Sequence, residues 1–217
     1  MGHAPTGILD LDHVPPGLHA HAREAIAEGD GGRFAGLAPG RDALALVADN
    51  AAVLRRRGAY EAALLAAFTR TRTNTAGWSL RDLGRLFGTA DRARLRAAGD
   101  PLPGPGPFPL HRGVAGVGRA RRPRGYSWTG SLDVACWFAT RRDLPAPAVF
   151  TATVPEGDVL AYVDGRGEQE YVCRPDVARR LAIDEAEIGG RARRLDERRQ
   201  RQVEAWLAEP LAGLAGA

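Results

Sequence analysis

A proline-rich segment in the middle of the chain places the strongest limit on its fold. Residues 101–109 read Pro-Leu-Pro-Gly-Pro-Gly-Pro-Phe-Pro, with five prolines and two glycines in nine positions. Because proline has no amide hydrogen and a fixed φ, no regular helix can run through this segment. The sequence therefore predicts a stiff, extended connector, with different architectures before and after it.

Before the connector the chain has the periodicity of helices. Apolar residues recur at three- and four-residue intervals over 42–55 and 60–69. Ser79, followed by Asp82, is typical of a helix N-cap, and 74–77 predicts a loop. We interpret residues 1–100 as a helical N-terminal region whose elements serve packing.

Beyond the connector, short runs of β-branched and aromatic residues predict strands over 110–114, 126–129, 148–154, 159–163 and 169–173. A helix over 132–141, with Ser131 as its N-cap, is expected between the second and third strands. After Pro175 the pattern indicates helix again, and the charged segment 184–207 predicts a helix with a break at Gly189–Gly190. Residues 101–217 are therefore expected to form an α+β unit that ends in a C-terminal helix.

The basic residues are all arginine, 30 in number, and the chain has no lysine. This composition excludes enzymes that need a phosphate-loop lysine or a Schiff-base lysine. Cys136 and Cys173 lie in apolar runs and are expected to be core residues, and the five histidines do not have metal-ligand spacing. No metal site is expected.

The charge is concentrated in one stretch. The whole chain has a net charge of +4, whereas residues 111–142 hold seven arginines against the single acid Asp133, a net charge of +6. A basic stretch of this kind favours an anionic partner, of which nucleic acid is one alternative. The chain shows no secretory signal pattern and no apolar run of about 18 residues. We therefore expect a cytoplasmic protein with no membrane partner, and predict no oligomeric state.

Three short patterns in the second half contain residues that could carry chemistry. Arg112 shares a strand face with Leu110 and Val114, so its guanidinium needs an anion, either a carboxylate of the chain or a bound phosphate. Ser127-Trp128-Thr129 would place two hydroxyls on one face and an apolar anchor on the other. Glu168 and Glu170, two positions apart at the entrance of a predicted strand, would share a face, where two carboxylates can divide acid–base work.

Taken in this order, the patterns resemble the ADP-ribosyltransferase fold, in the class marked by an arginine, a serine motif and a terminal glutamate. The resemblance rests on Arg112, Ser127-Trp128-Thr129 and Glu168-Gln169-Glu170, and it covers about residues 106–175. It implies a small split β-sheet and NAD as a substrate. The implied reaction is a transfer of ADP-ribose, with release of nicotinamide, to an arginine of a target protein.

The resemblance also implies roles for individual residues. Glu170 would bind the 2′-hydroxyl of the nicotinamide ribose and stabilise the cationic transition state, Ser127 would orient Glu170, and Glu168 would activate the acceptor. Arg112 would bind the pyrophosphate through its planar guanidinium. The further residues expected to line the NAD site are Gly113, Trp128, Thr129, Arg141 and Arg142.

Several alternatives stay open at this point. Another branch of the same fold uses a histidine, a tyrosine and a glutamate, for which His111 and Tyr126 are candidates, although alternation would turn them away from the faces of Arg112 and Ser127. The acceptor loop, 164–167, is short and lacks an aromatic residue, so water, nucleic acid or a small molecule are alternative acceptors. The arginine-rich loop 118–125 could hold NAD phosphates, meet an anionic partner or be solvated. The chain could also be a catalytically silent binding module that uses the arginines of 112–142.

Overall fold

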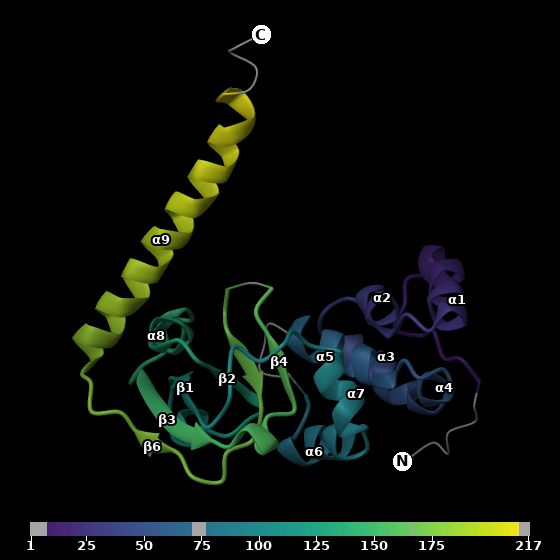
Figure 1. Ribbon diagram of the computed structural model, residues 1–217, viewed down its shortest axis with the longest axis horizontal. Helices are drawn as coiled ribbons and strands as arrows, with labels where there is room; N and C mark the ends of the chain where they lie inside the picture. Colours follow the sequence, from purple (N-terminus) through teal and green to yellow (C-terminus); the bar gives the residue numbers. More distant parts are fainter. Residues whose placement is uncertain (1–7, 71–76, 166, 213–217) are drawn as a thin grey trace. The chain divides into compact units, whose positions relative to one another are not determined.

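The chain divides into two compact units, Met1–Pro101 and Leu102–Ala217, and each is described here by itself. The computed structural model describes residues 8–70, 77–165 and 167–212, without the side chains of Arg119 and 208–212. The first unit is helical, and the second combines helices with an antiparallel sheet (Figure 1). The protein therefore belongs to the α+β class, and its architecture changes at the proline-rich segment.

Several helices of the first unit begin at an N-cap residue whose side chain accepts a hydrogen bond from a backbone amide of the first turn. At the predicted N-cap, the hydroxyl of Ser79 accepts from the amide of Asp82, while the Asp82 carboxylate accepts from the amide of Ser79. Of the predicted loop 74–77, only Gly77 lies within the described residues. The helical elements are η1 (Pro16–Leu18), α1 (His19–Glu28), α2 (Gly31–Gly36), α3 (Ala43–Asp49), α4 (Ala51–Arg56), α5 (Tyr60–Arg70), α6 (Leu80–Gly88) and α7 (Arg92–Ala97).

The segment 42–55, whose periodicity predicted helix, forms two helices, α3 and α4, that meet at Asn50. The side-chain amide of Asn50 donates to the carbonyl of Leu46 at 2.9 Å and to the carbonyl of Asp10 at 2.7 Å. Its side-chain oxygen accepts from the amide of Asp10 at 2.8 Å. These bonds compete with regular helical pairing, and the partner at Asp10 is not visible in a local sequence pattern.

The second unit contains one six-stranded sheet in which neighbouring strands run antiparallel, in the order β4-β5-β2-β1-β3-β6. Seven residue pairs join β1 to β3, whereas only His111 and Thr129 are paired between β1 and β2. The sheet therefore has its fewest paired residues at the junction between the β4-β5-β2 half and the β1-β3-β6 half. The strands are β1 (Phe108–Val114), β2 (Ser127–Thr129), β3 (Ala148–Val154), β4 (Ala161–Val163), β5 (Glu170–Val172) and β6 (Arg179–Arg180).

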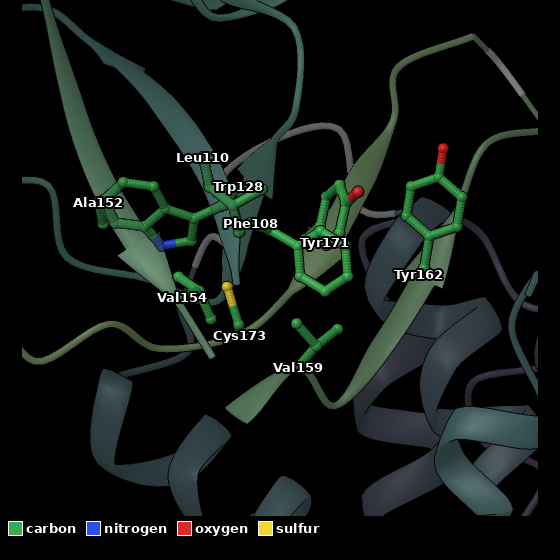
Figure 2. Close-up of a cluster of buried hydrophobic side chains, with 9 residues drawn as sticks. All are labelled: Phe108, Leu110, Trp128, Ala152, Val154, Val159, Tyr162, Tyr171 and Cys173. Atoms are coloured by element: carbon green, nitrogen blue, oxygen red, sulfur yellow. The ribbon is translucent and has the colours of Figure 1, made fainter. Parts of the chain in front are cut away.

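Each face of the sheet has its own apolar core. On one face, Trp128 lies among side chains that include Leu110, Tyr171 and Cys173 (Figure 2). On the other face, Val149 packs against α8 (Leu132–Thr140) and against Ile188 of α9 (Glu185–Ala212). Ser131 caps α8 as predicted, since its hydroxyl accepts from the amide of Val134 at 3.3 Å. The two short 3-10 turns are η2 (Gly118–Arg121) and η3 (Glu156–Asp158).

The C-terminal helix differs from its prediction in two ways. The chain after Pro175 is not yet helical, because β6 pairs with β3 before α9 begins. The predicted break at Gly189–Gly190 is absent, and α9 continues through both glycines. On either side of the glycines, Ile188 is buried in the core beside α8, and Arg191 pairs with Asp133 of α8 at 3.2 Å. Tertiary packing therefore outweighs the low helix propensity of glycine here.

Candidate functional site

A row of three polar side chains crosses the centre of the sheet. Antiparallel pairing sets His111 of β1 opposite Thr129 of β2, and Thr129 opposite Glu170 of β5. Residues that lie directly opposite one another in antiparallel strands project from the same face. Thr129 and Glu170 are only 5% and 8% exposed, and His111 is half-buried. The register therefore brings a histidine, a hydroxyl and a carboxylate together on one face.

Ser127 lies on the same face as this row. It is two positions before Thr129 in β2 and stands opposite Val172 of β5, so Glu170 is its diagonal neighbour across the two strands. Diagonal neighbours are roughly 7–8 Å apart, a span that a long side chain can cover. The geometry therefore allows the predicted contact between Ser127 and Glu170, while Thr129 is the residue of β2 directly opposite Glu170.

Arg112 lies on the opposite face of the sheet. It is paired with Phe150 in an unbroken β1–β3 register, and it shares its face with Leu110 and Val114 as predicted. That face carries the core built around Trp128. The sequence prediction put Arg112 and Ser127 in one site, but the structure separates their side chains by the sheet. Only the backbone of Ser127 meets Arg112, because its carbonyl accepts from Nη1 of the guanidinium.

The surroundings of Arg112 are those of an enclosed cation. A Cβ added at Gly125 would lie 2.7 Å from Nη2, so the guanidinium rests directly on the backbone of this glycine. Nε is buried without a hydrogen-bond partner among the described residues. Burial lowers the pKa of Arg112 to about 10, against the opposing effect of the Glu170 charge. The group is still a cation at neutral pH, and it is close enough to Glu170 to influence it electrostatically.

His111 was a candidate from the sequence only for the alternative branch of the fold, the one that uses a histidine, a tyrosine and a glutamate. Its Nδ1 is buried and has no hydrogen-bond partner among the described residues. Burial lowers its pKa, which favours the neutral imidazole at pH 7. A neutral ring can donate from one nitrogen and accept at the other. The sequence contained one signal for the surroundings of His111. Gly113, two positions later, shares its strand face, and a glycine inside a strand often marks a face that another element approaches closely.

Glu168 does not share a strand face with Glu170, so that part of the prediction is wrong. β5 begins at Glu170, and Gln169 between them has a φ of +46°, which breaks the alternation of an extended strand. The carbonyl of Glu168 accepts from the hydroxyl of Thr129 at 2.6 Å. Glu168 therefore belongs to the turn before β5, next to the site but outside the row.

Two of the remaining predicted ligands lie far from the row. α8 begins beside Thr129, whose hydroxyl accepts from the amide of Ser131 at 3.0 Å. Arg141 and Arg142 follow the other end of this helix, about 15 Å further along at 1.5 Å per residue. The guanidinium of Arg141 lies over the ring of Phe138, 4.4 Å from its centroid. The structure therefore does not bring these arginines to Glu170.

The other two predicted ligands have structural surroundings. Gly113 lies against α8, since a Cβ there would come within 1.9 Å of the carbonyl oxygen of Ala135. Trp128 is 2% exposed, in the core of the face opposite to Glu170. Their positions explain how β1 and β2 are held in place. His111, Ser127, Thr129 and Glu170 share one face of β1, β2 and β5, and Thr151 of β3 stands opposite His111 on the same face.

Comparison with protein-family models, with curated proteins and with solved structures found no match to this chain. Within the described residues, no cluster of three or more histidine, cysteine, aspartate or glutamate side chains is arranged to hold a metal ion. No helix in the same part of the chain has both the length and the apolar character needed to cross a bilayer.

Proposed function

We propose that this chain is an NAD-dependent ADP-ribosyltransferase that transfers ADP-ribose to an arginine side chain of a target protein. The observation that carries the proposal is the row of His111, Thr129 and Glu170, which unites a neutral imidazole, a hydroxyl and a buried carboxylate across three adjacent strands. The order β1, β2, α8, β3, β4 and β5 is also the order of elements on which the resemblance to these enzymes rests.

In the proposed reaction, the bond between nicotinamide and the ribose C1′ breaks and nicotinamide leaves with the bonding electrons. A guanidinium nitrogen of the acceptor forms the new bond to C1′ and gives up a proton. The transition state carries positive charge on the ribose, which a fixed carboxylate in a poorly solvated site stabilises. Glu170 has this role in the proposal, because it is buried and its strand is paired with β2.

The remaining residues serve this carboxylate and the substrates. Ser127 and Thr129 support Glu170 from the next strand, and His111 completes the NAD-binding face from β1 with hydrogen bonds that need no charge. Glu168, in the turn beside the row, takes the proton of the acceptor. Arg112 supports the site from behind, where its guanidinium holds the carbonyl of Ser127.

The test is incubation of the full chain with NAD labelled in the adenylate portion and a cell lysate. We expect label on protein, removable by treatments that cleave arginine-linked ADP-ribose, and none with Glu170→Gln. Glu185→Gln, an exposed carboxylate at the start of α9, is the matched control and should leave labelling unchanged. Release of free ADP-ribose without labelled protein would reassign the acceptor to water, and no NAD consumption would reject the proposal.

The loop before β2 favours a second candidate function, the binding of an anionic macromolecule. Arg121, Arg122 and Arg124 lie within seven residues of Ser127, and no carboxylate partner is found for them among the described residues. Nucleic acid is the partner such a loop suits best. Salt-dependent binding of an oligonucleotide, lost when the three arginines are replaced by glutamine and without NAD turnover in the wild type, would favour this candidate.

A further inference from the structure

The turn that precedes β5 holds a non-glycine residue in the left-handed region. Gln169 has a φ of +46°, two residues after Gly167 with a φ of +62°. A left-handed backbone is unfavourable for a residue with a Cβ, and such residues persist only where the surroundings impose the conformation. Because Gln169 directly precedes Glu170, whatever imposes this conformation also sets the direction in which Glu170 enters the sheet.

The first constraint comes from Asp164, which follows β4. Its carboxylate Oδ1 accepts a hydrogen bond from the amide of Gln169 at 2.9 Å. Its carbonyl accepts from the amide of Gly167 at 2.7 Å. One residue therefore bonds both left-handed positions of the turn, through its side chain and through its backbone.

The second constraint comes from the end of β2. The hydroxyl of Thr129 donates to the carbonyl of Glu168 at 2.6 Å and accepts from the amide of Ser131 at 3.0 Å. The amide of Gly130 donates to the carbonyl of Gln169 at 3.1 Å. The turn is therefore bonded to β2 on one side and to Asp164 on the other, and its two ends are not free to move separately.

We propose that Asp164 is a positioning residue for Glu170, acting through the backbone of Gln169. This inference rests on the proposed function, in which Glu170 stabilises the transition state. Without the Asp164 carboxylate, the amide of Gln169 loses its partner and the left-handed conformation loses one of its two constraints. Gln169 then relaxes toward an extended conformation, and the Glu170 carboxylate moves from its place beside Thr129.

The experiment compares NAD turnover by the full chain carrying Asp164→Ala, Asp164→Asn or the control Asp176→Ala, an exposed aspartate after Pro175. A misplacement of a catalytic group by about 1 Å costs about 100-fold in rate. We therefore expect kcat of Asp164→Ala to fall about 100-fold while KM changes little. Asp164→Asn keeps a side-chain oxygen that can accept from Gln169, so it should recover most of kcat, and Asp176→Ala should match the wild type.

Amide hydrogen exchange at Gln169 and Gly167 provides a readout that does not depend on activity. Exchange should be faster in Asp164→Ala than in Asp164→Asn, at an unchanged melting temperature. Unchanged kcat in a folded Asp164→Ala variant would overturn the positioning role. If the wild type consumes no NAD, the proposed function fails by itself. The resonances of Glu170 then decide the inference, since identical shifts in Asp164→Ala and wild type would refute it and displaced shifts would support it.

Discussion

Two neighbouring residues of β1, His111 and Arg112, project from opposite faces of the sheet. His111 faces the same side as Glu170, and Arg112 faces the core around Trp128. Both residues carry a buried nitrogen without a partner among the described residues, yet their environments differ. The guanidinium of Arg112 donates to the backbone carbonyl of Ser127. His111 instead lies in the same cross-strand row as the buried residues Thr129 and Glu170.

The lowered pKa of His111 predicts a pH-dependent stability. The unfolded chain takes up a proton on this residue below pH about 6.5, while the folded chain, with the lower pKa, resists protonation. The contribution of His111 is therefore present above that pH and is lost as the pH falls below it. Urea unfolding at pH about 7.5 and about 5 should show a larger loss for wild type than for His111→Gln. Equal losses would show that His111 is not buried in the neutral form.

Because His111 and Arg112 project from opposite faces, substitutions at the two positions are expected to reduce activity to different extents. Arg112→Met removes a buried charge, keeps the apolar length of the side chain and loses a hydrogen bond of roughly 1.5–3 kcal/mol to the Ser127 carbonyl. We expect it to fold and to keep kcat/KM for nicotinamide release within about tenfold of wild type, whereas His111→Ala should lose about 100-fold. The reverse order would place Arg112, and not His111, in contact with NAD.

Sequence reasoning located these residues but not their mutual arrangement. Alternation along β1 correctly puts Arg112 with Leu110 and Val114, and alternation along β2 separates Trp128 from Ser127 and Thr129. Alternation says nothing about which residues of two strands lie opposite each other. That register is a long-range property, and a shift by one residue exchanges the two faces. The pairing of His111 with Thr129 could therefore only come from the structure.

At the scale of elements, the packing of α8 on β1 depends on Gly113. A Cβ at this position would come within 1.9 Å of the Ala135 carbonyl oxygen and 2.7 Å of the Ala139 nitrogen, both of which belong to the helix backbone. Backbone atoms cannot move aside as a flexible side chain does. Gly113 therefore determines how closely the helix and the strand approach each other.

We therefore expect Gly113→Ala to lower the free energy of unfolding by about 3 kcal/mol, because the helix must shift away from the sheet. Gly157→Ala is the matched control, since a Cβ there has no neighbour within 4 Å, and its effect should stay within about 0.5 kcal/mol. Urea denaturation followed by circular dichroism measures both. Similar stabilities for the two variants would mean that α8 does not lie on Gly113.

Local signals predicted the starts of helices well, and distant contacts caused the errors. Ser79 and Ser131 cap α6 and α8 through bonds to residues three positions away, which a sequence pattern contains. The division of the helical segment 42–55 at Asn50 involves a bond to Asp10, and the continuity of α9 through Gly189 and Gly190 depends on packing against α8. β6 has only two residues and could not be recognised by periodicity.

At the scale of the whole molecule, the proline-rich segment predicted the change of architecture, and along the chain the first compact unit ends at Pro101 and the second begins at Leu102. The strand order was not predictable in the same way, because it joins segments far apart in the chain. β5 lies beside β2, although α8, β3 and β4 separate them in sequence. This non-local pairing is what brings Glu170 to Thr129, and the candidate site exists only in the folded sheet.

Titration of NAD into isotope-labelled protein, followed through the backbone amide resonances, tests whether NAD binds on the face of His111, Thr129 and Glu170. We predict that the largest shifts occur at these three residues and at Ser127, and that they shrink in His111→Ala. Shifts confined to Arg141 and Arg142, or no shifts at millimolar NAD, would show that NAD does not bind on this face.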